Sequence, residues 1–436
     1  MAEIHPFRGV HYNQRLVKDL AGVICPPYDI ISPQLQQELY QRHQYNFVRL
    51  EHNRELPQDT TKDNKYTRSA AVLERWLAQK VLVADKTSAI YLHDHYFQHG
   101  GKEYRRRGII VGVRLAAWEE NVVRPHEGTL VEHTSDRLSL LWVCQANTSP
   151  ILALFEDQGR QVSSLLGAKE KSPPMLSSSA IDGERHDVWA ITEPEAINQL
   201  CASLSEQPLY IADGHHRYES ALTYQRERCA SSSSVSGDEA FNFVMMELVD
   251  FADPGLVILP AHRLVRGMSK EALSELATRL NSFFEVEELP IGKTDVWRQI
   301  DRLLSGGDSS EVRLVLLGLV EGRLIQLKLR DFSAADQMMP HFHSELYKRL
   351  DVDIVDNVIP RELVGTGGEK SIISYSYDGQ DAVNRVFDQE YQLAFLLSPV
   401  RAEAVKAIAD AGDKMSRKAT YFYPKAPAGI VLHRLV

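Results

Sequence analysis

The chain has 436 residues, a length that predicts two or three domains rather than one. Its 49 Lys and Arg residues stand against 59 Asp and Glu residues, which gives a formal net charge of −10. This balance excludes the broad cationic face that nucleic-acid binding requires, although not a local basic pocket. With 44% hydrophobic and 25% charged residues, the composition is that of a globular protein and not of a disordered one.

The four cysteines, Cys25, Cys144, Cys201 and Cys229, lie far apart in the sequence. Without a Cys-x-x-Cys pair, a disulfide scaffold and a zinc ribbon are excluded, and a reducing compartment is indicated. The first residues are polar, and the most apolar segments are too short to span a membrane. We therefore expect a soluble, cytoplasmic protein with neither a membrane nor a nucleic acid as partner, and we leave a homo-oligomer open.

Hydrophobic periodicity predicts helices and strands that interleave along the chain. Apolar runs on both sides of a His-Gly-Gly-Lys turn predict a β-hairpin, and a Glu-Gly turn predicts a second one. The pattern favours an α+β fold, a mixed sheet core with antiparallel hairpins plus an additional α/β region. The predicted elements are a helix at Tyr66–Gln79, a hairpin of Ser88–Phe97 with Tyr104–Leu115, a strand at Leu209–Ala212, a helix from His215, a helix at Lys270–Phe284, a hairpin of Val312–Val320 with Arg323–Leu329, and a helix at Arg401–Ala411.

Three turn-rich stretches, at residues 169–179, 231–237 and 365–368, have the composition of loops. None is long enough to tether freely moving domains. We predict an α/β region over residues 1–265, which holds the two main motifs, and an α+β region over residues 266–436 that packs back on the site.

The strongest local signal is LYIADGHHRYESAL at Leu209–Leu222. A strand, an Asp213-Gly214 turn and a helix direct the positive end of the helix dipole at one spot, where glycine allows close approach of a ligand. The following His-His-Arg adds donors that suit phosphate oxygens. The alternative is an N-capping Asp213 before solvated side chains, but cations at a helix N-terminus oppose the dipole unless an anion is bound.

A second signal is RPHEGT at Arg124–Thr129, which is followed by Asp136-Arg137-Leu138 and by Ser149-Pro150-Ile151-Leu152. A glutamate beside a histidine in a loop is usually a solvated pair. The Pro-His-Glu triplet within this segment indicates a functional site only in combination with the first motif.

These motifs together resemble the ParB/sulfiredoxin-like superfamily, and especially its free serine kinase branch, which phosphorylates the amino acid from a nucleotide donor. Over its whole length the chain is similar to the domain-of-unknown-function family ten-fifteen, in which CPPYDIIS at Cys25–Ser32, DPGLVILPAHR at Asp253–Arg263 and TYFYPK at Thr420–Lys425 also fit. The link between Ile151 and Leu209 is longer than in the small kinases. Sulfiredoxin chemistry is excluded, since His215 stands where its cysteine would be.

The kinase resemblance implies specific roles. Glu127 would be the catalytic carboxylate beside the attacking hydroxyl, and Asp213 a second carboxylate or a magnesium contact. The implied cofactors are ATP or ADP, or CTP, with Mg²⁺, and this is coherent with the needs of phosphoryl transfer. The implied nucleotide-binding residues are His126, Gly214, His215, His216 and Arg217.

Basic residues downstream are candidates for binding an acidic substrate. Lys418 and Lys425 lie in MSRKATYFYPK, and Arg263 ends an apolar strand. The alternative for the first two is a helix C-terminus with favourable cations, followed by a buried aromatic strand.

Two further patterns are weaker. The rigid Cys-Pro-Pro-Tyr-Asp loop could bring Tyr28 or Asp29 to a pocket, although a structural use is favoured. His93 and His95, at i and i+2 on a strand, put both rings on one face, with His99 nearby. Since the spacing fixes no carboxylate or third ligand, we do not predict a metal site from it.

The sequence therefore predicts a nucleotide-dependent phosphotransferase that acts on a small hydroxylated metabolite, with serine or a related hydroxy acid expected first. A rival is a regulatory module that binds or hydrolyses nucleotide to switch a partner. A sensor could tolerate the loss of Glu127, whereas a phosphotransferase could not. A third hypothesis is a scaffold in which the DGHHRY turn binds nothing.

Overall fold

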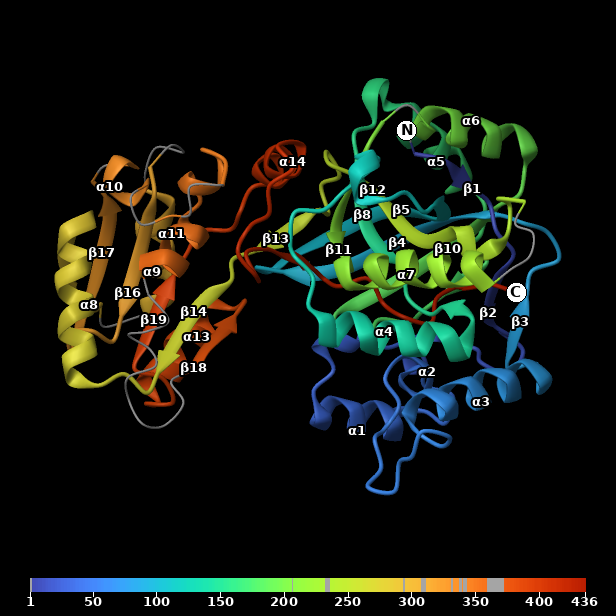
Figure 1. The fold of residues 1–436 in the computed structure, drawn as a ribbon, viewed down its shortest axis with the longest axis horizontal. Coiled ribbons are helices and arrows are strands. Elements are labelled where there is room, and N and C mark those ends of the chain that lie inside the picture. Colours follow the sequence, from blue (N-terminus) through green and yellow to red (C-terminus); the bar gives the residue numbers. More distant parts are fainter. Residues whose placement is uncertain are drawn as a thin grey trace. The chain divides into compact units, whose positions relative to one another are not determined.

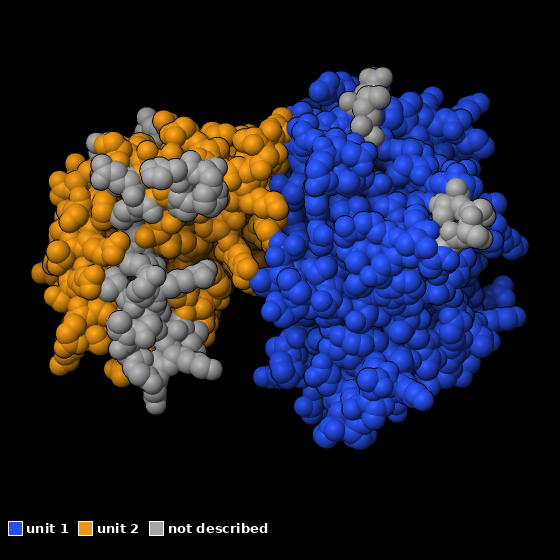
Figure 2. Space-filling view, viewed as in Figure 1, with its two compact units in different colours: residues 1–125, 129–257, 424–436 blue, residues 126–128, 258–423 orange. Residues whose placement is uncertain are grey.

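The computed structural model describes residues 2–205, 207–231, 236–292, 295–306, 311–330, 332–336, 339, 343–358 and 372–436. The chain forms two compact units, coloured separately in Figure 2, and each is described by itself. Unit 1 comprises residues 1–125, 129–257 and 424–436, and unit 2 comprises residues 126–128 and 258–423. Residues 424–436 return to unit 1, so the predicted C-terminal region of residues 266–436 is divided between the units. The predicted loop at residues 365–368 lies outside the described residues.

The centre of unit 1 is a mixed β-sheet. Its strands are β1 (Ile4–His5), β4 (Ile90–His99), β5 (Lys102–Arg114), β6 (Val123–Arg124), β8 (Ile151–Phe155), β9 (Leu176–Ser177), β10 (Glu184–Ile191), β11 (Leu209–Asp213) and β12 (Phe243–Asp250). The order is β6-β11-β8-β12-β5-β4-β10-β9, with β1 paired to β5 (Figure 1). The β6–β11 and β8–β12 pairs are parallel, and the long antiparallel β4–β5 pair confirms the first predicted hairpin. This mixture of sheet and helix confirms the predicted α+β class.

Helices α4 (Val131–Cys144) and α7 (His215–Ser231) lie side by side against this sheet (Figure 1). Helices α5 (Gln161–Lys169) and α6 (Pro194–Ser205) contribute to the same apolar core. Leu200 and Tyr218 are fully buried in it. Burial of a large apolar side chain contributes about 1.5–3 kcal/mol, so this core fixes α7 and the turn that precedes it.

A smaller antiparallel sheet of unit 1 has the order β3-β2-β21-β7. Asn64 caps helix α3 (Lys65–Ala78) by accepting hydrogen bonds from the amides of Tyr66 and Thr67, and Trp76 of that helix is buried in the adjoining core. The predicted helix at Tyr66–Gln79 is thereby confirmed. The strands are β2 (Gly9–Tyr12), β3 (Leu82–Ala84), β7 (Ala146–Asn147) and β21 (Leu432–Arg434), and the helices are α1 (Pro33–Arg42), α2 (Val48–Glu51) and α3 (Lys65–Ala78).

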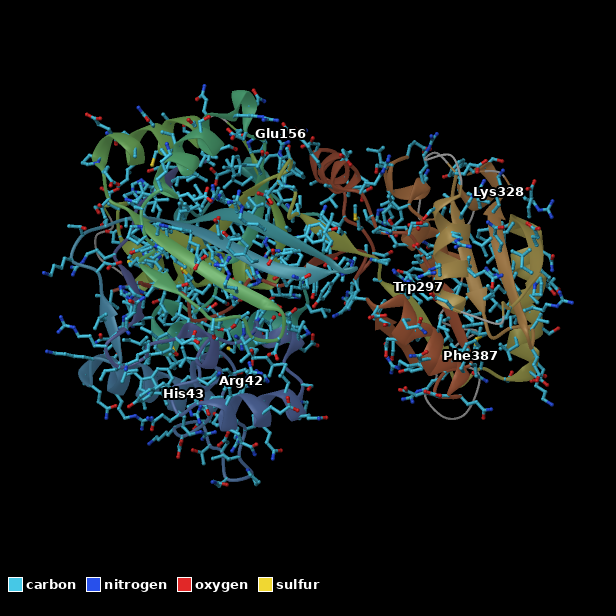
Figure 3. The ribbon with its side chains drawn as sticks, turned by 180° about the vertical axis from the view of Figure 1, so that it is seen from behind. Arg42, His43, Glu156, Trp297, Lys328 and Phe387 are labelled. Atoms are coloured by element: carbon cyan, nitrogen blue, oxygen red, sulfur yellow. The ribbon has the colours of Figure 1, made fainter. Side chains whose placement is uncertain are left out.

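Unit 2 is built on an antiparallel sheet of order β15-β17-β16-β19-β14-β18. The strands are β14 (His262–Arg266), β15 (Phe284–Pro290), β16 (Arg313–Leu317), β17 (Arg323–Leu329), β18 (Ile372–Ser376) and β19 (Leu393–Leu396), with β13 (Val257–Leu259) and β20 (Tyr421–Tyr423) apart from them. The helices are α8 (Lys270–Phe283), α9 (Val296–Ser305), α10 (Phe332–Asp336), α11 (Asp351–Val358), α13 (Gly379–Phe387) and α14 (Ala402–Asp410). The β16–β17 hairpin, α8 and α14 confirm three predictions. Trp297, labelled in Figure 3, packs on Gly379, where a Cβ would come within 2.1 Å of the ring.

Short 3-10 helices connect these elements at Leu20–Gly22, Tyr28–Ile30, Trp118–Glu120, Gln158–Arg160, Ala240–Asn242 and Tyr347–Arg349. All four cysteines are free, as their separation in the sequence predicts. Among the described helices, none combines the length and the apolar character needed to cross a membrane.

Candidate functional site

The strand–turn–helix predicted from the sequence is formed by β11, Gly214 and α7. The strand carries a β-bulge between Ile211 and Asp213, and Gly214 follows at a φ of +97°. Residues with a side chain rarely adopt that conformation, so this turn requires glycine. The Tyr218 amide donates to the Gly214 carbonyl at 3.1 Å and starts the helix. The Asp213 carboxylate therefore stands at the positive end of the α7 dipole.

Asp213 is held between two cations. Nζ of Lys425 donates to its Oδ1, and Nη2 of Arg217 donates to its Oδ2 at 2.7 Å. The exposed fractions of the three side chains are only 11, 8 and 10%, respectively. Burial alone would raise the pKa of Asp213, but Lys425 and then Arg217 outweigh burial and hold that pKa well below its usual range. The cluster therefore keeps an ionised carboxylate with two positioned positive charges.

Further contacts lock the Arg217 guanidinium in place. Its Nη1 donates to Oγ of Ser149 at 3.0 Å and to the carbonyl of Pro150. A Cβ on Gly214 would come within 2.9 Å of Nη2, so the guanidinium lies directly over the glycine. Its Nε is buried without a hydrogen-bond partner among the described residues. An unsatisfied buried donor is costly, and a bound anion would relieve that cost.

A buried glutamate supports this cluster. Glu51, on α2, is 1% exposed and accepts hydrogen bonds from Oγ1 of Thr148 at 2.6 Å and from Oγ of Ser149 at 3.1 Å. Its Oε1 also lies 3.5 Å from Nη1 of Arg137. A hydrogen-bonded chain thus runs from Glu51 through Ser149 to Arg217 and restrains the cationic side of the turn.

Arg137 belongs to the same buried network. Its guanidinium stacks on the ring of Tyr28 at 3.8 Å from the centroid, which gives the Cys-Pro-Pro-Tyr-Asp loop a structural use. A cavity of about 40 Å³ is lined by Arg137, Ser149 and Arg217 among others. That volume and those polar walls suit ordered water beside the cluster.

The same loop brings a second carboxylate to the cluster. Asp29 follows Tyr28 and is exposed to solvent. Desolvation by the surrounding protein raises the pKa of Asp29, and the Asp213 carboxylate raises it further, while Lys425 and Arg217 oppose both effects. Asp29 therefore lies within electrostatic reach of the predicted site.

The two histidines at the start of α7 differ in their use. His215 is 5% exposed, and its charge would help to lower the pKa of Asp213. His216 accepts a hydrogen bond at Nε2 from the Leu130 amide at 2.9 Å, so its neutral form is protonated at Nδ1. Its ring also contacts the ring of His133. His216 thus anchors the segment that enters α4, and this role competes with a phosphate contact.

His126 and Glu127 lie in a hydrogen-bonded cluster of unit 2. Nε2 of His126 is 2.9 Å from Oγ1 of Thr420, and the Thr420 hydroxyl donates to Oε1 of Glu127 at 3.5 Å. The Met415 amide donates to the His126 carbonyl at 2.8 Å. Glu127 is therefore assigned to a cluster of unit 2, whereas Asp213, Arg217 and Lys425 form a cluster of unit 1.

Two predicted substrate contacts also belong to unit 2. Arg263 is fully buried, and its Nε and Nη2 donate to the two carboxylate oxygens of Asp356 at 2.9 and 2.8 Å. This bidentate pair favours a structural role for Arg263. Lys418 is exposed and has a φ of +57°. Of the three basic residues predicted to contact substrate, Lys425 is the one that joins Asp213.

The kinase resemblance implies that Asp213 is a second carboxylate or a magnesium contact, and the contacts of this carboxylate disfavour the magnesium alternative. Each of its oxygens already accepts a hydrogen bond from a cationic side chain. A divalent cation there would be repelled by the Lys425 ammonium and the Arg217 guanidinium, which lie against the two carboxylate oxygens. The residues present at Asp213 therefore do not fit a magnesium ion.

Sequence reasoning did not identify Glu51, Thr148 or Ser149 as members of the site. A signal was present, since Glu51 follows the apolar residues Phe47, Val48 and Leu50, and a buried glutamate needs several donors. The Asn-Thr-Ser-Pro segment supplies two of those donors as hydroxyls.

The fold and the site define an α+β protein of two units, in which a cation-paired aspartate closes a strand–turn–helix of the larger sheet. A family model matches residues 4–353, and the chain belongs to that family, which is described as "Protein of unknown function (DUF1015)". This match confirms the family expected from the sequence.

The solved structures to which this chain is similar include a conserved hypothetical protein from Pyrococcus furiosus, at 14% identity and a TM-score of 0.36, covering 75% of this chain and 95% of that one. A free serine kinase in complex with AMP has 13% identity and a TM-score of 0.37, with 74% and 91% covered. SbnI with a C-terminal truncation, from Staphylococcus aureus, has 10% identity and a TM-score of 0.34, with 73% and 85% covered. No curated protein matches the chain.

Proposed function

We propose that this chain is a nucleotide-dependent phosphotransferase that acts on a small hydroxylated metabolite, with serine or a related hydroxy acid as the first candidate. The observation that carries the proposal is the placement of Lys425 and Arg217 on Asp213 at the start of α7. Phosphoryl transfer depends mainly on positioned positive charge, which neutralises the charge on the phosphate oxygens.

The cationic side chains are arranged for a phosphate donor such as ATP or ADP, with CTP as a further candidate. Phosphate oxygens would compete with Asp213 for the Lys425 ammonium and the Arg217 fork, and would meet the positive end of the α7 dipole. Both cations are restrained before a ligand arrives, so little side-chain entropy is lost on binding.

Glu127 keeps the role of catalytic base that the kinase resemblance implies. Its carboxylate has a hydroxyl donor in Thr420, which in turn is bonded to His126. A base oriented in this way could accept the proton of the attacking hydroxyl. If Glu127 is the base, its replacement should abolish phosphate transfer and leave nucleotide binding unchanged.

The first experiment measures nucleotide binding. The full chain is titrated calorimetrically with AMP, ADP, ATP and CTP, with and without Mg²⁺. We expect Lys425→Met and Arg217→Lys to weaken binding at least tenfold, because the first removes a charge and the second removes the planar fork. Lys86→Met, at an exposed lysine of unit 1, is the matched control. Binding by none of the nucleotides would refute the proposal and favour the scaffold.

The second experiment measures transfer of labelled phosphate to a panel of hydroxylated metabolites that includes serine. We expect Glu127→Gln to bind nucleotide like the parent but to lose transfer at least 100-fold. Glu119→Gln, at an exposed glutamate, is its control. If nucleotide binds but no metabolite is phosphorylated, and Glu127→Gln behaves like the parent, the rival regulatory module is the correct description.

A further inference from the structure

The sheet of unit 1 buries a second polar cluster that the proposed function does not use. His93 and His95 on β4 lie beside His186 and Glu184 on β10, and the strand register sets His95 opposite His186. All three histidines are at most 3% exposed, whereas the Glu184 side chain is 31% exposed. The cluster thus reaches solvent through one carboxylate.

We propose that His95, Glu184 and His186 form a binding site for a divalent transition-metal ion of the zinc type. Ligand atoms of the three residues all lie within 4.8 Å of one another. Nε2 of His95 is 2.7 Å from Oε2 of Glu184, and the rings of His95 and His186 have centroids 4.2 Å apart. Two imidazoles and one carboxylate suit zinc and leave a fourth tetrahedral position for water. Magnesium and calcium prefer all-oxygen sites and fit less well.

A hydrogen-bonded chain prepares His186 as a ligand. Nδ1 of His93 lies 2.8 Å from Oε1 of Glu247, and Nε2 of His93 lies 3.1 Å from Nδ1 of His186. Burial would raise the pKa of Glu247, but His93 outweighs that effect and lowers it to about 2, so the carboxylate accepts the Nδ1 proton of His93. His93, with Nδ1 held by Glu247, presents its Nε2 to Nδ1 of His186. An ion on His186 would therefore bind at Nε2, the ring nitrogen that His93 does not engage.

Gly108 on β5 leaves room in the sheet for the hydrogen bond between Glu247 and His93. Glu247 is on β12, and it must reach across β5 to contact His93 on β4. A Cβ on Gly108 of β5 would come within 3.0 Å of Cγ and 3.1 Å of Oε1 of Glu247. The glycine therefore leaves the space through which the carboxylate passes.

The charges of the cluster favour a bound cation. The two carboxyl groups of Glu184 and Glu247 outnumber the one guanidinium of Arg106, and Oε2 of Glu247 is buried without a partner among the described residues. Arg106 donates to Nδ1 of His95 at 3.2 Å and to the Pro424 carbonyl at 2.7 Å. Neutral His95 thus directs its Nε2 proton at Glu184. When the ion binds Nε2 of His95, the proton of that ring is on Nδ1. Arg106 then loses its hydrogen bond to His95 and keeps its hydrogen bond to the Pro424 carbonyl.

The test uses the full chain without a histidine tag. After chelation, calorimetry with Zn²⁺ is expected to show one site per chain, and Co²⁺ is expected to give the visible absorption of a tetrahedral N/O site. Glu184→Gln and His186→Ala should lower the Zn²⁺ affinity at least 100-fold. Glu247→Gln should lower it 10–100-fold through the orientation of His93. His99→Ala, which removes a histidine of the same strand, should bind like the parent.

Circular dichroism checks that each variant is folded, and Glu184→Gln, at the partly exposed ligand, is the variant least able to disturb the core. The proposal is overturned if the folded parent binds no Zn²⁺. It is also overturned if Glu184→Gln and His99→Ala both bind Zn²⁺ like the parent, because the site would then lie elsewhere.

Discussion

The ion pair of Lys425 with Asp213 permits a quantitative test of the site. Lys425→Met removes the ammonium and keeps most of the apolar stem, so the carboxylate of Asp213 loses one of its two cations. Arg217 still donates to Oδ2 at 2.7 Å. The variant therefore isolates the contribution of the lysine charge.

At about 4 Å between charge centres and an effective dielectric near 20, the gross attraction is about 4 kcal/mol. The desolvation of the lysine offsets part of it. Removing the sole partner of a buried charge costs about 3–5 kcal/mol, and here Arg217 remains. We expect Lys425→Met to lower the free energy of unfolding of unit 1 by about 2 kcal/mol, below that range because one cation is kept.

A double-mutant cycle with Asp213→Asn checks this value. Once the carboxylate is neutral, the lysine has little left to stabilise, so we expect a coupling energy of about 1–3 kcal/mol. Hydrogen exchange of β11 and α7 amides is the assay, because it reports on unit 1 even when the two units unfold separately. If the double variant loses the sum of the two single losses, the pair is uncoupled and the reasoning is refuted.

The pH dependence of the same variant follows from the lowered pKa of Asp213. A carboxylate with a depressed folded-state pKa stabilises the fold above its ordinary value of 3.8, and this contribution is lost as the pH falls through the folded-state value. Lys425→Met has less of this contribution to lose. The stability difference between parent and variant should therefore narrow in acid, and a constant difference down to acid unfolding would contradict the assignment.

Three further predictions concern neighbouring positions. Gly214→Ala should lower the free energy of unfolding by about 1–3 kcal/mol and abolish nucleotide binding, because a φ of +97° strains any side chain and the added Cβ would meet Arg217. Thermal unfolding measures the loss of stability. Gly167→Ala on α5, where an added Cβ meets nothing, is the control. Glu51→Gln should lower stability by about 2–3 kcal/mol, since an amide nitrogen would face hydrogen-bond donors, and an unchanged urea midpoint would contradict this. Burial raises the pKa of Glu184 from 4.5 to about 7. Its contribution to the stability of the fold is therefore full below pH 4.5 and is lost as the pH rises toward 7. Thermal midpoints recorded with chelator should show this decline in the parent and not in Glu184→Gln.

Local patterns predicted the elements well, because their signals lie within a few residues. The β4–β5 hairpin follows from alternation around a glycine turn, and α3 follows from one apolar stripe. The strand–turn–helix at Asp213 was predicted for the same reason. In each case the residues that decide the structure are neighbours in the chain.

The partners within the sites were not predictable in this way. Lys425 is separated from Asp213 by 212 positions, and no local pattern links them. The His95 cluster depends on the pairing of β4 with β10, which are joined through several intervening elements. Only the tertiary fold decides which strand supplies the carboxylate. Arg263 looks like a ligand contact from sequence, but its charge is satisfied by Asp356, which is 93 positions away.

The return of residues 424–436 to unit 1 has a consequence for synthesis on the ribosome. Strand β21 fills the position between β2 and β7, so until it emerges those two strands present unpaired edges. The segment that brings Lys425 to Asp213 is translated after all of unit 2. A nascent chain can therefore complete unit 2 first, and it acquires the cationic side of the Asp213 cluster only in the last step of folding. Premature termination anywhere between residues 258 and 423 would leave a chain with the DGHHRY turn but without its lysine.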